Sequence, residues 1–247
     1  MSKNLKFYLK DTIRQMVDFS ATAQSRGVEP PPVQKPFLPE DVVLSLPGPR
    51  EWAGIGDLSV REAVASRKSR RSFGGEALSL EELAFLLWAT QGVRRVASPA
   101  AVYRTVPSAG CRHALETYLA IFRVTGVARG LYRYLPLEHA LVAVAHRDDL
   151  EAAVVRAALG QRFVGNGAAT FLWTIVPARM EWRYAEASYK VIALDAGHVC
   201  QNLYLACEVV GAGTCAVAAY DQEAADTLLG VDGESEFTLY MAPVGKA

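Results

Sequence analysis

The chain has 247 residues, of which 51% are apolar and 21% are charged, a mixture typical of a globular protein with a substantial buried core. Lysine plus arginine equals aspartate plus glutamate at 26 each, so no net field would attract nucleic acid or a membrane surface. The charged N-terminus lacks the apolar core of a signal peptide, and no stretch approaches the roughly 20 uncharged apolar residues of a membrane span. We therefore expect a cytoplasmic protein with neither a nucleic-acid nor a membrane partner.

Residues 1–45 are predicted to form an arm outside the compact domain of residues 46–247. The stretch KFYLKDTIRQMVDFSATAQ (6–24) spaces its apolar side chains as an amphipathic helix does. It is followed by GVEPPPVQKPFLPE (27–40), whose five prolines enforce an extended path. We expect this arm to lie against its own domain or against a partner subunit.

Helices and strands are mixed in the domain without strict alternation. Capping boxes at Ser59–Glu62 and Ser79–Glu82 mark two helix starts, and a polar loop is expected between residues 92 and 115. The predicted helices span 60–67, 81–91, 148–160, 183–210 and 222–230. The predicted strands span 116–124, 131–136, 141–146, 169–177, 213–220 and 236–245. Short turns after residue 124 favour an antiparallel meander, and the mostly apolar 183–210 helix should be central and buried. The fold class is therefore α+β.

Self-contained catalytic motifs are missing from the sequence. The four histidines and four cysteines show neither zinc-ligand spacing nor a triad-like arrangement, so no metal site is expected. No phosphate-binding loop or dinucleotide fingerprint is present. An enzyme of this kind usually takes its chemistry from an organic cofactor, and no catalytic side chain is assigned with certainty.

SRKSRRSF (66–73) is the one concentrated run of positive charge. If the chain continues extended beyond the helix at 60–67, Arg67, Ser69 and Arg71 point to one side, and Arg70 points to the other. Two guanidinium groups flanking a hydroxyl are suited to a phosphate. A solvated basic face remains the alternative from this segment alone.

Several motifs together resemble those of the nitroreductase family, whose members bind FMN. The segment at 67–73 is similar to the family signature R-R-S-x-R-x-F/Y. YRTVPSAGCRHALETYL (103–119) and GLYRYLPLEHAL (130–141) resemble segments of its SagB-type branch. LDAGHVCQNLYLACEVVGAGTCAVAAYD (194–221) and the closing YMAPVGK resemble its later helix, strand and ending. The resemblance covers residues 46 to 247.

The resemblance implies roles for individual residues. Arg67 and Ser69 would hold the FMN phosphate and ribityl chain, with Lys68 beside them, and Arg71 would approach the pyrimidine edge of the flavin. Lys246 would be a further cation for the phosphate.

Two backbone segments complete the implied flavin site. The P-S-A-G loop would lie against the flavin of the partner subunit of a homodimer. Its residues are Pro107, Ser108, Ala109 and Gly110. The amides of Ala218 and Ala219 would lie near flavin N5. Such a dimer would also give the N-terminal arm a surface to cover.

The implied activity is FMN-dependent transfer of hydride from NADH or NADPH to a small electron-poor acceptor, such as a nitro compound or quinone, in a ping-pong scheme. Alternatives are a SagB-type dehydrogenase that oxidises a peptide azoline, or a flavin-binding subunit without turnover. Azoline dehydrogenases of that branch carry a Lys-Tyr pair, which falls here on Arg183-Tyr184. Tyr184 is a candidate catalytic residue, whereas a guanidinium remains protonated and cannot replace lysine as a base.

Overall fold

The computed structural model describes residues 5–247. Its centre is a seven-stranded sheet of order β1-β6-β5-β4-β7-β9-β8, in which every neighbouring pair is antiparallel. The strands of this sheet are β1 (Val43–Ser45), β4 (Leu115–Ile121), β5 (Gly130–Leu135), β6 (Ala140–Ala145), β7 (Ala169–Ile175), β8 (Ala212–Thr214) and β9 (Phe237–Lys246). The helices are α1 (Val60–Ser66), α2 (Leu80–Gln91), α3 (Leu150–Ala157), α4 (Ala178–Tyr184), α5 (Ser188–Val209) and α6 (Gln222–Leu229). The α+β prediction and the predicted meander β4-β5-β6 are confirmed.

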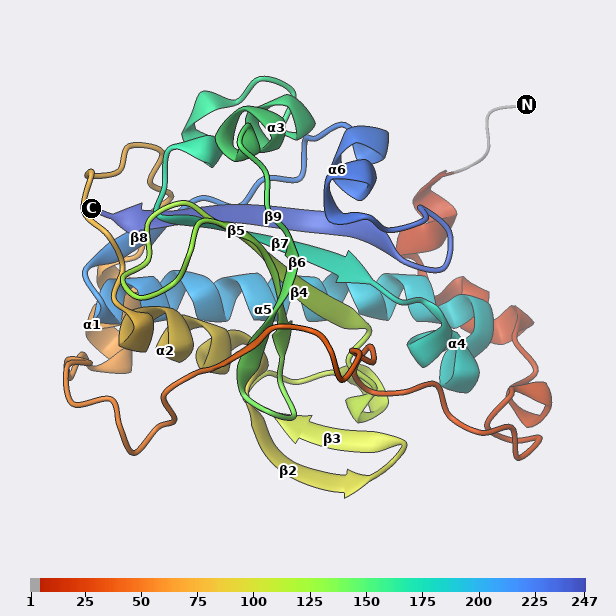
Figure 1. Cartoon of the computed structure of the whole chain (residues 1–247). Helices are drawn as coiled ribbons and strands as arrows, with labels where there is room; N and C mark the ends of the chain where they lie inside the picture. Colours follow the sequence, from red (N-terminus) through yellow and green to blue (C-terminus); the bar gives the residue numbers. More distant parts are fainter. Residues whose placement is uncertain (1–4) are drawn as a thin grey trace.

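Helices cover both faces of the sheet (Figure 1). The long helix α5 crosses one face with α1 and α2 beside it, while α3 and α6 lie on the opposite face. The side chains of Ser59 and Ser79 cap α1 and α2, and both predicted capping boxes are present. No helix within residues 5–247 is long and apolar enough to cross a membrane.

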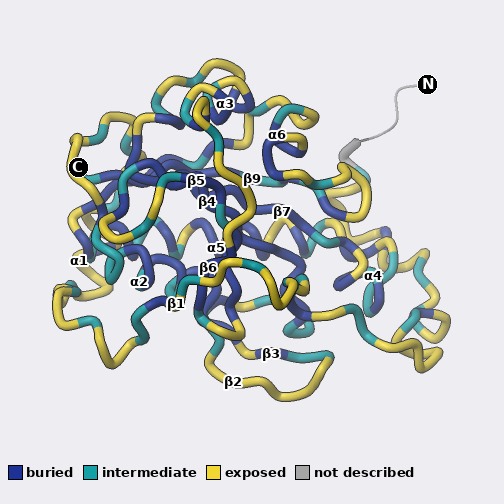
Figure 2. Tube along the Cα trace, in the orientation of Figure 1, coloured by how far each residue is buried: buried dark blue, intermediate teal, exposed yellow. Residues whose placement is uncertain are grey.

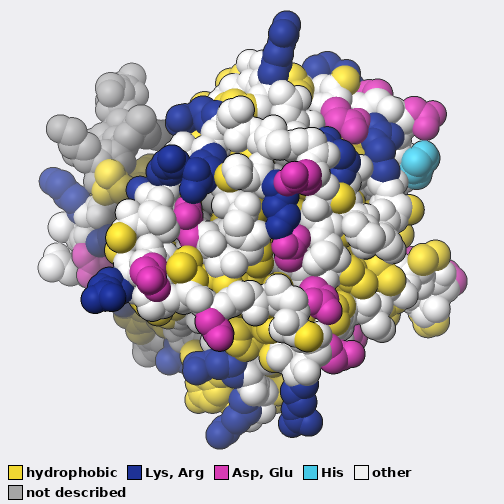
Figure 3. All heavy atoms as spheres, turned by 90° about the vertical axis from the view of Figure 1, so that its left-hand side faces the viewer, with side chains coloured by type: hydrophobic (Ala, Val, Ile, Leu, Met, Phe, Trp, Pro, Cys, Tyr) yellow, Lys and Arg dark blue, Asp and Glu magenta, His cyan; other side chains and the backbone are white. Residues whose placement is uncertain are grey.

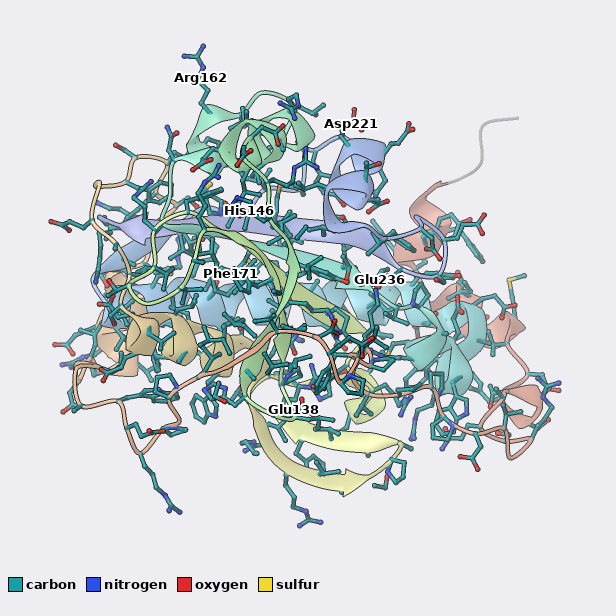
Figure 4. The ribbon with its side chains drawn as sticks, in the orientation of Figure 1. Glu138, His146, Arg162, Phe171, Asp221 and Glu236 are labelled. Atoms are coloured by element: carbon teal, nitrogen blue, oxygen red, sulfur yellow. The ribbon has the colours of Figure 1, made fainter. Side chains whose placement is uncertain are left out.

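The core lies between the sheet and α5. Strands β4 and β7 are buried at every position, because each has a helical layer on both sides (Figure 2). Phe171 and Trp173 of β7 belong to the same buried cluster as Leu203 of α5, and Figure 4 shows Phe171 between the sheet and the helix. The β-branched and aromatic residues at 116–124 and the apolar stretch at 169–177 therefore predicted these strands correctly.

The predicted helix 183–210 is wrong at its N-terminal end. Helix α4 ends at Tyr184, and Ala185 has a left-handed φ of 45° before α5 begins at Ser188. In a continuous helix, the carbonyl of Trp182 would accept a hydrogen bond from a later residue of the same helix. Here it accepts one from the backbone amide of Gln24 at 2.8 Å. Contact with the arm therefore interrupts a sequence of otherwise good helix formers.

Two other segments differ from prediction. The expected polar loop at 92–115 contains an antiparallel hairpin of β2 (Val93–Ser98) and β3 (Ala101–Arg104). Because β2 is mostly exposed, it lacks the apolar alternation that predicts a strand. The strand expected at 213–220 ends at Thr214. Beyond it, the Ala216 amide donates to the Tyr204 hydroxyl at 2.8 Å and not to a neighbouring strand.

The predicted amphipathic helix at 6–24 is also wrong in the described part. It consists of short 3₁₀ turns at Leu5–Leu9, Asp11–Met16 and Phe19–Ala21. Leu9 is 75% exposed and Met16 is 74% exposed, so little apolar packing supports a continuous helix. Short helices depend on such packing for their stability.

The proline-rich part of the arm lies against its own domain. Buried arginine side chains donate to its carbonyls: Arg112 to Pro31 at 2.9 Å, Arg179 to Pro32 at 2.7 Å, Arg104 to Val33 at 2.8 Å, and Arg133 to Lys35 and Pro36 at 2.8 Å. Prolines have no amide hydrogen, so this segment presents mainly acceptors to a surface of donors. The arm therefore lies against its own domain, which is one of the two positions expected for it.

A buried carboxylate completes this contact. Glu116 pairs with Arg179 and Arg133 and accepts a hydrogen bond from the Lys35 amide at 2.8 Å. Burial alone would raise the pKa of Glu116, but the two guanidinium groups outweigh burial and hold the pKa below its ordinary value. Figure 4 shows Glu138 and Glu236, two further acids that bind arm side chains: Glu138 accepts from Gln34 at 2.7 Å and Glu236 from Lys35 at 2.5 Å.

Candidate functional site

The basic segment 66–73 begins where α1 ends and joins the β8 edge of the sheet. Arg67 is the C-cap of α1, and its amide donates to the Ala63 carbonyl. Ser69 forms a parallel bridge with Thr214, and the Arg70 amide donates to the Thr214 carbonyl at 2.9 Å. The segment is therefore extended and fixed by the backbone of β8.

Tyr204 of α5 receives two side chains of this segment. The Arg67 guanidinium lies over its ring, 5.2 Å from the centroid, and Ser69 Oγ lies 3.0 Å from its hydroxyl. The same hydroxyl accepts the hydrogen bond from the Ala216 amide. Tyr204 thus connects the basic segment to the chain that follows β8.

Arg70 takes a different direction. Its guanidinium pairs with Glu208 at 3.4 Å, and its side chain covers Gly213, where a Cβ would lie 2.2 Å from Arg70 Cδ. Only a glycine leaves room for this arrangement. The positive charge of Arg70 is therefore paired with an acid of the same chain.

The remaining cations of the segment have no acidic partner in the part of the chain that the structure describes. Arg71 lies over the ring of Phe163 at 5.8 Å, and Lys68 is exposed. Within residues 5–247, no acid pairs with Arg67, Lys68 or Arg71. A set of three unpaired cations beside a hydroxyl has the composition of a phosphate site.

Lys246 is placed differently from these cations. Its amine bonds to the Glu82 carboxylate and donates to the Val210 carbonyl at 2.8 Å. Its backbone carbonyl accepts a hydrogen bond from the Gly74 amide at 2.8 Å. The charge of Lys246 is therefore neutralised by α2 in this structure.

Ala218 and Ala219 follow the isolated bridge between Val217 and Met241 and are both exposed. In the described part of the chain, neither of their amides donates to a protein group. The pair therefore offers free donors on a surface with small side chains. It lies two and three residues beyond Ala216, which is fixed by Tyr204.

The P-S-A-G loop is held by Asp195 of α5. The Ala109 amide donates to Asp195 at 3.3 Å, and the Ser108 hydroxyl accepts from the His113 amide at 3.0 Å. Burial raises the pKa of Asp195, although hydrogen bonds from Ser108 and Ala109 oppose the rise. Pro107 is exposed, and Gly110 adopts a left-handed φ of 61°.

Arg183 and Tyr184 lie directly against this loop. A Cβ at Gly110 would be 2.8 Å from Arg183 Cδ and 2.8 Å from the Tyr184 hydroxyl. The Arg183 guanidinium lies over the Tyr184 ring at 5.7 Å from its centroid. The candidate catalytic residue and its arginine neighbour therefore belong to the P-S-A-G end of the molecule.

The basic segment and the P-S-A-G loop contact α5 at different points along its length. Asp195 and Tyr204 are nine residues apart on α5, which separates them by about 14 Å along the helix axis. Charged groups of both signs are scattered over the side that carries α1 and the C-terminus (Figure 3). The concentration of positive charge in the basic segment therefore does not extend over the rest of this side.

Tyr204, Phe163 and Asp195 were not predicted as site residues. Tyr204 and Asp195 lie in a helix whose apolar pattern predicts only burial, and Phe163 lies in a 3₁₀ turn. Their contacts with the basic segment or the loop arise from tertiary packing. No local sequence signal identifies them.

Comparisons with known sequences are consistent with this geometry. The model of the nitroreductase family matches residues 64–246. MJ1384 of Methanocaldococcus jannaschii, named as a nitroreductase, is 30% identical over 193 residues, covering 78% of this chain and 93% of the relative. The trifolitoxin-processing protein TfxB of Rhizobium leguminosarum is 29% identical over 126 residues, covering 49% of this chain but 34% of TfxB.

Solved structures agree in fold. A nitroreductase-type protein of Ralstonia eutropha is 27% identical with a TM-score of 0.68, covering 89% of this chain and 97% of the other. The E. coli microcin synthetase McbBCD complex contains a chain that is 18% identical with a TM-score of 0.61, with coverages of 98% and 96%. The NADPH:FMN oxidoreductase of Vibrio harveyi, complexed with NAD+, is 16% identical with a TM-score of 0.53, with coverages of 75% and 67%. The chain therefore belongs to the nitroreductase family, and this membership supports a general oxidoreductase activity for it.

Proposed function

We propose that this protein is an FMN-dependent oxidoreductase that uses NADH or NADPH to reduce a small electron-poor acceptor, such as a nitro compound or a quinone. The observation that carries the proposal is the arrangement of Arg67 and Arg71 on either side of Ser69 in an extended segment, where neither guanidinium has an acidic partner among residues 5–247. The fold neighbour from Vibrio harveyi, named as an NADPH:FMN oxidoreductase, supports the choice of cofactors.

The phosphate of FMN fits the cations of this segment. A phosphate monoester carries close to two negative charges near neutral pH, and Arg67 and Lys68 are free to balance them. Ser69 supplies a hydroxyl beside them. A contact from Lys246 remains part of the proposal, but it requires the amine to leave Glu82.

The isoalloxazine ring would be met by backbone groups. The amides of Ala218 and Ala219 are exposed and have small side chains, so a flat ring is able to approach them closely. A positive charge from Arg71 would stabilise negative charge that develops on such a ring. When bound, FMN would supply two-electron transfer between a nicotinamide and an acceptor.

A homodimer would complete the site. Ser69 contacts α5 at Tyr204, whereas the P-S-A-G loop contacts it at Asp195. We therefore infer that each flavin site combines the basic segment of one chain with the loop of its partner. An apolar hollow of about 410 Å³ between α1, α2 and α5 supports contact on this side. Val60 of α1, which lines this hollow, is 75% exposed.

Reduction of the purified protein by nicotinamides tests the proposal. Reconstituted with FMN under anaerobic conditions, the protein should lose its yellow absorbance on addition of NADH or NADPH. The absorbance should return when a nitroaromatic compound or a quinone is added. A protein that binds no FMN refutes the proposal, and one that keeps its colour with both nicotinamides excludes them as reductants.

The likeness to TfxB favours a second candidate, a SagB-type dehydrogenase that oxidises azoline rings in a peptide. Arg183 weakens this candidate because guanidinium does not act as a general base at accessible pH. Conversion of a thiazoline peptide to the thiazole by the FMN-loaded protein would establish it. A flavin-binding subunit without turnover would bind FMN and show neither activity.

A further inference from the structure

Arg183 stands out among the arginines that are partly removed from water. Within residues 5–247, the half-buried arginine side chains that make neither a hydrogen bond nor an ion pair are those of Arg67 and Arg183. Each is stacked over a tyrosine ring, Tyr204 or Tyr184. Such a cation has lost part of its hydration and has gained no anion in return.

The groups around Arg183 do not neutralise it. Arg112 is buried behind it, and burial, followed by the positive charges of Arg179 and Arg183, lowers the pKa of Arg112 to about 10. Of the acids on the adjoining turns, Glu181 accepts a hydrogen bond from Tyr189 at 2.6 Å, and Glu186 is exposed without an ion pair to Arg183. Asp195 is bonded to the P-S-A-G loop.

The backbone holds this arrangement under strain. Ala185 combines a φ of 45° with a ψ of −134°, which is unfavourable for a residue with a Cβ. Strained residues of this kind are concentrated at functional sites. On the other side, Gly110 leaves room for both Arg183 and Tyr184, since a Cβ there would collide with each of them.

We infer that Arg183 binds a carboxylate of the substrate, so that the acceptor is a small electron-poor compound bearing a carboxylate. The guanidinium presents a planar set of donors that matches a carboxylate with two parallel hydrogen bonds. Contact with the Tyr184 ring, 5.7 Å from its centroid, holds the guanidinium beside the loop before the anion arrives. The inference rests on the proposed function, because it names the substrate class of the same site.

Kinetics with a matched pair of acceptors test the inference. The FMN-loaded enzyme should show a kcat/KM for 4-nitrobenzoate at least tenfold above that for neutral 4-nitrobenzamide, a ratio that corresponds to about 1.4 kcal/mol. Arg183→Gln should lower this ratio about tenfold, mainly by raising the KM for 4-nitrobenzoate, and Arg183→Lys should lower it less. Arg162→Gln is the matched control, because Arg162 is exposed on the α3 side of the sheet, remote from α4 (Figure 4).

A binding measurement separates this inference from the proposed function. Calorimetric titration with benzoate and benzamide needs no turnover, and only benzoate should bind, with an affinity that Arg183→Gln reduces about tenfold. Equal binding of the two probes, or unchanged benzoate affinity in Arg183→Gln, overturns the inference. If the protein takes up no FMN, the proposed function fails, while the benzoate titration of that protein still decides whether Arg183 is an anion site.

Discussion

Ser69 Oγ lies 3.0 Å from the hydroxyl of Tyr204, although the two residues are 135 positions apart in the chain. The same hydroxyl accepts a hydrogen bond from the Ala216 amide at 2.8 Å, and the guanidinium of Arg67 lies over the Tyr204 ring. One side chain of α5 therefore positions the end of α1 and the segment beyond β8. Both elements belong to the proposed flavin site.

Removing the Tyr204 hydroxyl should weaken FMN binding. Tyr204→Phe keeps the ring beneath Arg67 but frees Ser69 and the Ala216 amide, which would no longer be fixed. We expect the Kd for FMN to rise about three- to tenfold, as for the loss of one hydrogen bond, measured by quenching of flavin fluorescence. Tyr189→Phe removes an exposed hydroxyl that is bonded to Glu181 and should leave the Kd unchanged. Equal losses in both variants would contradict the role of Tyr204.

Arg67 and Arg70 have different surroundings, so their replacement should affect different properties: FMN binding for Arg67 and the stability of the fold for Arg70. Arg67→Ala removes an unpaired cation from the proposed phosphate site and should raise the Kd for FMN at least tenfold. Arg70→Ala leaves Glu208, whose side chain is 8% exposed, without its partner. It should lower the free energy of unfolding by about 1–3 kcal/mol and change the Kd little. Similar losses of affinity in the two variants would argue against this division.

The backbone amide of Lys35 should contribute more to the stability of the fold than the lysine side chain does. Lys35→Pro removes one of the three donors to the buried Glu116, and the loss of one hydrogen bond to a charged group costs about 1.5–3 kcal/mol. Lys35→Ala keeps that amide and loses the contacts of the amine with Glu236 and Tyr118, which are made by a side chain that is 40% exposed. Urea unfolding should therefore show Lys35→Pro to be the less stable variant by about that amount. Equal stabilities would indicate that the arm is not held by this hydrogen bond.

His113 should make the fold sensitive to acid. Burial, and then the positive charge of Arg104, lowers its pKa to about 3 from an ordinary value of 6.5. The folded state keeps the ring neutral while the unfolded chain binds a proton, so stability is lost as the pH falls from 6.5 towards 3. The free energy of unfolding should fall by up to about 1.4 kcal/mol per pH unit more in the wild type than in His113→Asn. Parallel pH dependences of the two proteins would exclude a buried neutral His113.

Much of the fold was predictable because its signals are local. The β-branched and aromatic residues of β4 predict a strand, and the apolar sequences of β7 and α5 predict buried elements. The serine and glutamate pairs at the starts of α1 and α2 predict their caps. The break at Ala185 was not predictable, since it depends on a hydrogen bond from Gln24 to Trp182. The hairpin β2–β3 was missed because an exposed ribbon needs no apolar alternation.

The candidate site was predictable only where the sequence itself concentrates charge. The alternation in the segment from Arg67 to Arg71 is visible in the sequence, and the structure gives Arg70 a partner of its own in Glu208. The pairing of Lys246 with Glu82 joins residues 164 positions apart, so it left no local signal. The same is true of the contact of Arg183 with Gly110, which depends on where α4 ends.

The most direct test of the proposed site is an equilibrium titration of the flavin-free protein with FMN and with riboflavin, which lacks the phosphate. We predict one FMN per chain and a riboflavin Kd at least a hundredfold higher, because charge-assisted contacts to phosphate contribute about 1.5–3 kcal/mol each. In Arg67→Ala the two ligands should differ far less. Failure to bind FMN, or equal affinity for FMN and riboflavin in the wild type, would contradict the assignment of the basic segment as the phosphate site.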